Sequence, residues 1–146
     1  MRIVYDSDVV LDYFLKRQPG LKGSTAITLL ALLRFEQGCL MSNSVADMHY
    51  LLAQELGNLR AQFVVEEILK EFRVIPVEED DLTEALSKRW DDLQACLMSV
   101  CAKKVHSHFI ITRNIRNFRQ SKVTTLTPEE YFSWCDRNNI HYHFSD

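Results

Sequence analysis

The sequence predicts an α/β fold, a three-layer α/β/α sandwich with a central parallel sheet. Short apolar runs at residues 3–5, 39–41 and 109–111 have the length and composition of buried strands. A polar residue suited to helix capping follows each run, and stretches with helical periodicity lie between them. Strands that alternate with helices over short connections form a parallel sheet covered on both faces.

The amino-terminal half begins with a strand over residues 1–5, which are rich in Ile, Val and Tyr. Asp6, Ser7 and Asp8 follow it as helix-capping residues and start a first helix. Residues 18–24 hold two of the four glycines and one of the three prolines, which predicts a loop before a helix at 24–35. The further elements expected in this half are a strand at 39–41, a helix from 42–44 to Gly57, a helix at 59–72 and a strand at 74–77.

The carboxyl-terminal half is expected to contain helices at residues 81–90 and 91–104, then strands at 109–111 and 122–126. A last helix starts at Thr127, because a capping hydroxyl, a proline at the first helical position and an acid three residues on form a strong start signal. Residues 138–146 are a polar and aromatic tail without a clear period.

Composition and charge exclude several classes of protein. With 146 residues, 47% of them hydrophobic, we expect one domain over 1–146, its core about 2–132, that needs no metal or disulfide to fold. The net charge of −3 offers no general attraction for nucleic acid, so a nucleic-acid partner would need a local cationic patch or metal ions. The longest apolar run, 26–33, is too short to span a membrane, and acids interrupt the amino-terminal region where a signal peptide would be apolar. We therefore expect a cytoplasmic protein, whose four cysteines, with no CxxC pair, are reduced.

Acidic residues follow or precede the expected strands and helices at several points. In parallel α/β sheets the ligand crevice lies at the carboxyl ends of the strands, and Asp6 directly follows the first strand. A helix cap explains Asp6 equally well, and Asp47, three residues after Ser44, has the spacing of a capping box. Asp91 and Asp92 open a helix, where the macrodipole favours acids. Together, acids from separate segments could converge on one hard cation.

Five segments in order resemble the PIN-domain family over residues 2–132. They are IVYDSDVVLD at 3–12, SVADMHYLL at 44–52, VIP at 74–76, FIITRNIRNF at 109–118 and LTPEEYF at 126–132. The resemblance implies a PIN-like sandwich, often dimeric, and metal-dependent cleavage of RNA with Mg²⁺ or Mn²⁺. It also implies kinship with the toxins of toxin–antitoxin pairs.

The resemblance implies a set of site residues, with departures from the family pattern. Asp6, Asp47 and Asp91 are the implied catalytic and metal-binding residues, although Asp47 stands where the family usually has Glu. Gln94 and Asn117 replace two usual acids and would hold the metal directly or through water, with less charge and therefore weaker binding. Asp91 is expected on the face of Gln94, with Asp92 pointing elsewhere. Asp8 replaces a usual Asn and adds charge near Asp6.

Two hypotheses from different classes follow. The first is a metal-dependent ribonuclease in which Thr112, Arg113, Asn114 and Arg116 position the site or contact the phosphate. The second is a PIN-like module that has lost catalysis and binds nucleic acid or protein.

The remaining expectations concern partners and contacts. Arg113, Arg116, Arg119 and Lys122 form the densest basic stretch, which we interpret as a phosphate-contacting patch, the alternative being a solvated loop. Both tryptophans, Trp90 and Trp134, are interpreted as packing residues and not as base-stacking platforms. RNA is the expected substrate, and a small antitoxin the expected protein partner. A homodimer is a further hypothesis, and its face would lie on the apolar arc of Leu29, Leu30, Leu32, Leu33 and Phe35.

Overall fold

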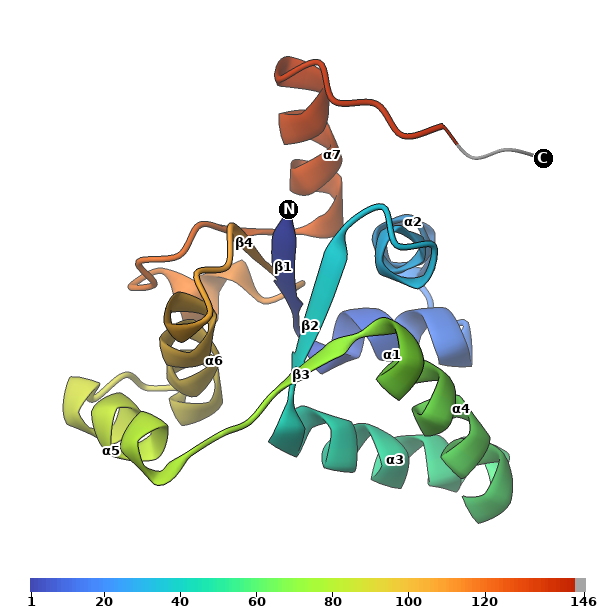
Figure 1. Ribbon diagram of the computed structural model, residues 1–146, viewed down its shortest axis with the longest axis horizontal. Coiled ribbons are helices and arrows are strands. Elements are labelled where there is room, and N and C mark those ends of the chain that lie inside the picture. Colours follow the sequence, from blue (N-terminus) through green and yellow to red (C-terminus); the bar gives the residue numbers. More distant parts are fainter. Residues whose placement is uncertain (144–146) are drawn as a thin grey trace.

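The computed structural model, which describes residues 1–143, is built around one five-stranded, all-parallel sheet (Figure 1). The strand order is β3-β2-β1-β4-β5. The strands are β1 (Arg2–Tyr5), β2 (Gln37–Met41), β3 (Arg73–Ile75), β4 (Phe109–Ile111) and β5 (Thr125–Leu126). The chain winds outward from β1 through β2 to β3, then returns to place β4 on the other side of β1. The carboxyl ends of β1 and β4 therefore form the switch point at which such sheets bind ligands.

Helices cover both faces of the sheet. The first layer contains α1 (Ser7–Leu15), α2 (Leu21–Leu32), α3 (Ser42–Leu56), α4 (Asn58–Glu71) and α7 (Pro128–Arg137). The second contains α5 (Glu79–Lys88), α6 (Leu93–Lys104) and the short 3-10 helix η1 (Ile115–Phe118). This arrangement confirms the predicted three-layer α/β/α sandwich.

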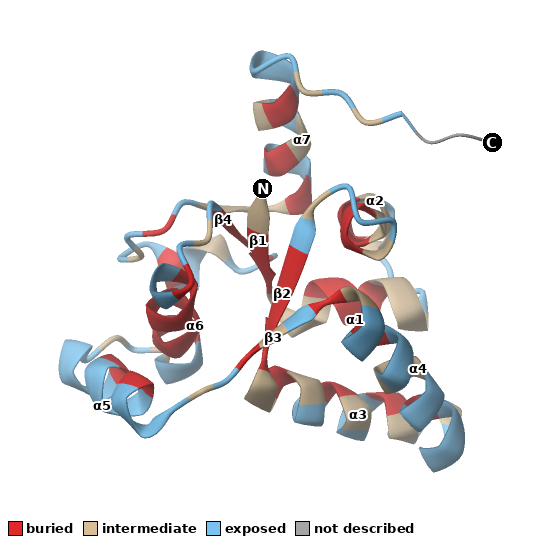
Figure 2. Ribbon diagram, viewed as in Figure 1, coloured by how far each residue is buried: buried red, intermediate tan, exposed pale blue. Residues whose placement is uncertain are grey.

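Alternating side chains of the strands build two separate cores. In β1, Ile3 and Tyr5 join the cluster under the first layer, whereas Val4 joins the cluster under the second. This is the two-residue period of a strand buried on both faces. Helix α6 is buried continuously from Ala95 to Ala102, as a helix with an apolar circumference should be (Figure 2).

The helix starts differ from the sequence-based expectations in two places that matter for the site. Helix α3 begins at Ser42, so Ser44 is inside the helix and does not cap it. Helix α6 begins at Leu93 with Asp92 as its N-cap residue, so Asp91 precedes the helix. The predicted start at residue 91 is therefore two residues early.

The loop predicted for residues 18–24 is also too long, because α2 begins at Leu21 and continues through Gly23. A β-carbon on Gly23 would lie 3.2 Å from the β-carbon of Pro128 and 2.2 Å from an oxygen of Glu129. Gly23 therefore permits the close packing of α2 on α7 and does not mark a loop.

The tail expected at 138–146 is partly packed. The Tyr142 hydroxyl donates to Glu36 Oε1 at 2.7 Å, so the Tyr131 hydroxyl donates to Tyr142 across 2.6 Å. Residues 144–146 lie outside the described part. Within residues 1–143, no helix is long and apolar enough to cross a membrane.

Only part of the apolar arc proposed as a dimer face is exposed in the structure. Leu30 is fully buried in the first-layer core, and Leu29 and Leu32 are half-buried. Leu33 and Phe35 are exposed, and the ring of Phe35 packs on Tyr142.

Candidate active site

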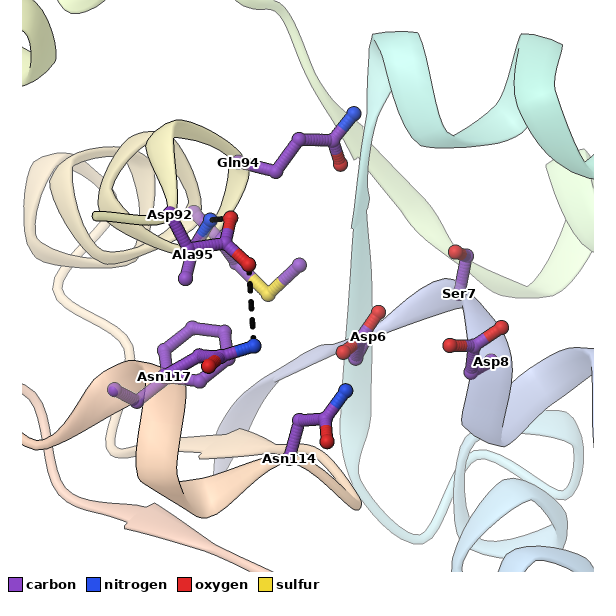
Figure 3. A pocket seen from close by; sticks show the side chains of 10 residues that line it. Asp6, Ser7, Asp8, Asp92, Gln94, Ala95, Asn114 and Asn117 are labelled. Atoms are coloured by element: carbon purple, nitrogen blue, oxygen red, sulfur yellow. Dashed lines mark hydrogen bonds between the residues drawn. The ribbon is translucent and has the colours of Figure 1, made fainter. Parts of the chain in front are cut away.

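A polar cavity of about 300 Å³ lies at the switch point, beside the carboxyl ends of β1 and β4 (Figure 3). The β1–α1 junction forms one side of it, the start of α6 faces that junction, and η1 with the preceding turn completes the wall. Its lining residues are Asp6, Ser7, Asp8, Asp92, Gln94, Ala95, Met98, Asn114, Asn117 and Phe118. No basic side chain is among them, so the cavity is negatively charged.

Asp6 is held at the centre of this site by the neighbouring strand. Its backbone N–H donates to the carbonyl of Ile111 at 2.8 Å, which continues the β1–β4 pairing past the end of β1. Its side chain makes no helix-capping hydrogen bond and instead accepts one from the Thr112 hydroxyl at 2.8 Å. The same Thr112 oxygen accepts the N–H of Asn114 at 3.0 Å, which directs its proton toward Asp6. Asp6 is still the N-cap residue of α1, and the backbone N–H of Asp8 interacts with its carboxyl, so the capping role and the contact with Thr112 occur together.

The surroundings of Asp6 favour its protonated form. Burial raises the pKa of the Asp6 carboxyl, and the negative charge of Asp8 adds to this, while the hydrogen bond from Thr112 opposes it. The pKa of Asp6 stays above its ordinary value. A cation in the cavity would favour the ionised carboxylate.

Asp92 lies across the cavity from Asp6 and joins two elements. Its Oδ1 accepts the N–H of Ala95 at 3.0 Å, which caps α6, and its Oδ2 accepts from Asn117 Nδ2 at 3.1 Å (Figure 3). The expectation that Asp92 points away from the site is wrong, because as the N-cap residue it precedes the helical turn. The signal in the sequence was its position directly before an apolar helix.

The structure brings together some of the expected residues and separates others. Gln94, Asn114 and Asn117 line the cavity with Asp6. Asp91 lies outside it and lines a neighbouring hollow. Asp47 is exposed in the second turn of α3 and does not line the cavity. The capping box expected for Asp47 is absent because α3 starts at Ser42.

Arg113 has a structural partner that the sequence analysis missed. Its Nε lies 3.1 Å from Oδ2 of Asp12, a fully buried carboxylate on α1. Arg17 Nε donates to Asp12 Oδ1 at 3.0 Å, and Ser24 Oγ donates to Oδ2 at 2.9 Å. Arg113 therefore anchors the turn after β4 to α1, and its expected contact with a phosphate stays a prediction. An acid on the apolar face of a helix, five residues before an arginine, was the available signal.

The donor atoms of the cavity suit a hard cation. Carboxylate and amide oxygens line it without His or Cys, which favours Mg²⁺ or Mn²⁺ over softer metals. Within residues 1–143, no group of three or more His, Cys, Asp or Glu is placed to hold a metal ion. An ion bound here would therefore complete its shell with amides and water.

The fold and the cavity define a doubly wound α/β protein with an acidic pocket at its switch point. The model of the PIN domain family matches residues 2–116, and the chain belongs to this family. Among curated protein sequences, none matches the chain significantly.

Several solved complexes contain chains similar in structure to this one. VapBC2 from Rickettsia felis, solved with a DNA fragment from its promoter, matches with a TM-score of 0.63 and 14% identity, over 87% of this chain and 98% of that chain. A toxin–antitoxin complex from Klebsiella pneumoniae matches with a TM-score of 0.65 and 15% identity, over 86% and 97%. FitAcB from Neisseria gonorrhoeae matches with a TM-score of 0.64 and 18% identity, over 87% and 98%. At these identities the likeness shows the fold.

Proposed function

We propose that this protein is a metal-dependent endoribonuclease whose centre is Asp6. The observation that carries the proposal is the placement of Asp6, oriented by Thr112 and facing Asp92 and Asn117 across an open, acidic cavity. A carboxylate positioned by a buried hydroxyl at the switch point is suited to hold a cation against a bound phosphate.

The residues that would hold Mg²⁺ or Mn²⁺ are Asp6 and Asp92, with Gln94 and Asn117 contributing amide oxygens directly or through water. Asn117 donates its Nδ2 to Asp92, which leaves its Oδ1 available as an acceptor. A bound divalent ion lowers the pKa of a water ligand and neutralises charge on the attacked phosphate.

The charge of the site predicts weak metal binding. Both oxygens of Asp92 already accept hydrogen bonds, and the pKa of Asp6 is raised by burial. Amides at positions 94 and 117 add oxygen without charge. Asp8 supplies a third carboxylate in the cavity, but Arg17 lies 3.5 Å from it, so Asp8 offsets this deficit only in part.

A second candidate function is a PIN-like module without catalysis that binds nucleic acid or protein. The hydrogen-bonded state of Asp92 and the uncharged amides of Gln94 and Asn117 favour it. Metal-dependent cleavage by the wild type separates the two, and if it is absent, Gln94→Asp with Asn117→Asp shows whether the missing acids are the cause.

We also propose a small antitoxin as the protein partner. Support comes from the fold shared with a chain of the Klebsiella pneumoniae toxin–antitoxin complex. An inhibitor that places a basic side chain between Asp6 and Asp92 would neutralise the cavity and exclude a cation.

A divalent-ion thermal shift tests the metal site. Binding only to the folded state, with the ion at ten times its Kd, stabilises by about 1.4 kcal/mol, or roughly 3 to 5 °C in Tm. Asp6→Asn and Asp92→Asn should abolish the shift, with a smaller effect from Asp91→Asn. The matched control is Asp136→Asn, an exposed acid on α7, which should keep it. An unchanged melt in Mg²⁺ and Mn²⁺, or equal shifts in all four variants, would contradict the metal site.

A further inference from the structure

A second hollow, of about 140 Å³, adjoins the acidic cavity and shares Asp92 and Asn117 with it. Its remaining lining residues are Trp90, Asp91, Arg116, Arg119 and Gln120. Segments on either side of it, the α5–α6 connection and η1 with the residues after it, are held together by the hydrogen bond from Asn117 to Asp92. The two hollows therefore adjoin at this hydrogen-bonded pair.

The two hollows differ in charge. The lining of the cavity around Asp6 has three carboxylates and no cation, whereas the second hollow has the exposed guanidinium groups of Arg116 and Arg119 beside the carboxylates of Asp91 and Asp92. In the part of the chain that the structure describes, neither arginine forms an ion pair, in contrast to Arg113 beside Asp12. These two side chains are thus available to an external anion, and their planar forks suit phosphate oxygens.

Trp90 supplies a flat apolar surface in the same hollow. The residue is half-buried and packs against the second-layer core, while part of it lines the hollow. Packing on one side fixes the indole, so it offers a preformed surface at low entropic cost. Trp90 therefore packs as predicted and also has a surface that faces the hollow.

We propose that this hollow is a subsite for one nucleotide of single-stranded RNA, next to the phosphate bound at Asp6. Trp90 stacks on the base, and Arg116 and Arg119 bind the phosphate that follows. A duplex base is already stacked between its neighbours, so stacking on Trp90 selects an unpaired strand. The subsite rests on the proposed ribonuclease function for its substrate, although its binding does not require catalysis.

Tryptophan fluorescence tests the subsite because the chain has only two tryptophans. The other, Trp134, packs on Phe109 at the start of β4 with ring centroids 4.8 Å apart, away from the carboxyl ends of the strands. In an Asp6→Asn background, which should keep RNA intact, Trp134→Phe leaves Trp90 as the sole emitter, and Trp90→Phe is the matched control. Titration with a decameric oligoadenylate should quench Trp90 emission and leave Trp134 emission unchanged.

Anisotropy of a labelled oligoadenylate gives the affinity. Trp90→Leu, which keeps apolar volume, should weaken binding about tenfold. Arg116→Ala with Arg119→Ala should weaken binding and reduce the slope of log K against log salt by about 0.7, the value for one neutralised phosphate on a single strand. The Tm of each variant is measured as well, and binding is compared at a temperature well below all of these values, so that a folding defect is recognised separately.

Binding without a change in Trp90 emission, affinity unaffected by both sets of substitutions, or no binding at all would overturn the subsite. If the wild type cleaves RNA while Trp90 emission does not change, the subsite is refuted and the ribonuclease proposal is supported. If Trp90 is quenched and the arginines matter but no metal supports cleavage, the ribonuclease falls and the subsite stands.

Discussion

Two aspartates six residues apart, Asp6 and Asp12, have opposite environments. Asp12 is fully buried and accepts from Arg17 and Ser24, with Arg113 at ion-pair distance. Asp6 accepts one side-chain hydrogen bond, from Thr112, and faces an open cavity. The arginine partners of Asp12 balance its charge within the fold. Asp6 has no such partner, so its carboxylate oxygens can still bind a cation in the cavity.

The contrast between Asp12 and Asp6 shows how the partners of a carboxylate distinguish a structural role from a functional one. A buried carboxylate with two guanidinium partners fixes the segments that carry those partners, here the connection after α1 and the turn after β4. That turn also carries Thr112, so the Asp12 cluster holds the residue that orients Asp6. Stability and function of this site are therefore linked through one loop.

The largest effect is expected when Asp12 loses its cations. Arg17→Ala with Arg113→Ala leaves a fully buried carboxylate with only Ser24, and the free energy of unfolding should fall by about 3 to 5 kcal/mol. Urea denaturation measures this. The matched control removes two exposed arginines, with Arg60→Ala and Arg137→Ala, and should cost less than about 1 kcal/mol. An equal fall in the free energy of unfolding in both double variants would contradict the structural role of Asp12.

A steric change beside the same cluster should have the next largest effect. Gly20 has ordinary right-handed helical backbone angles, but a β-carbon there would lie 2.6 Å from Asp12 Oδ2 and 3.1 Å from Arg113 Cδ. Gly20→Ala should therefore destabilise the fold by about 1 to 3 kcal/mol through crowding alone. An unchanged denaturation midpoint would mean that the cluster can move aside freely.

Thr112→Val tests the connection between the two aspartates. Loss of the hydroxyl removes two hydrogen bonds, the one donated to Asp6 and the one accepted from the Asn114 N–H, and should cost about 1 to 2 kcal/mol. It should also raise the pKa of Asp6 further, because Thr112 opposes the effect of burial. The acid limb of the pH profile of cleavage should move to higher pH. Thr112→Ser keeps the hydroxyl and should leave the profile in place; equal profiles for Val and Ser would contradict the role of this bond.

The smallest effect concerns the stability of Asp6→Asn without metal. Because the folded-state pKa of Asp6 is raised above 3.8, the folded protein holds this proton more tightly, and stability falls as pH rises from 3.8 through the folded pKa. Asn removes that cost, so the variant should be slightly more stable than the wild type at neutral pH. The difference should vanish below pH 3.8. A wild type more stable than the variant at pH 7 in EDTA would contradict this sign.

Most of the architecture follows from local patterns in the sequence. Apolar triplets such as Phe109–Ile111 and the capping box at Thr127 correctly place strands and a helix start, because these signals involve neighbouring residues. The position of Asp6 follows from the same rule, since a buried strand must end at the sheet edge. The helix through Gly23 was not predictable, because its packing on α7 joins residues more than a hundred positions apart.

The site was less accessible to sequence reasoning. Because α6 starts two residues later than predicted, Asp92 and not Asp91 lines the cavity. Sequence patterns place helix ends only to within one or two residues. The partner of Arg113 depends on a contact between residues 12 and 113, which no local pattern contains. Contacts between segments distant in the sequence therefore required the structure.

The central claim is that Asp6, and not the surrounding fold alone, makes this protein a metal-dependent ribonuclease. The most direct measurement is cleavage of a single-stranded RNA pool in Mn²⁺ by the wild type and by Asp6→Asn, both fully folded at the assay temperature, with an EDTA control. The wild type should cut RNA only with the metal, and Asp6→Asn should fall to the EDTA background. Cleavage by Asp6→Asn at the wild-type rate, or no metal-dependent cleavage by the wild type, would contradict the claim.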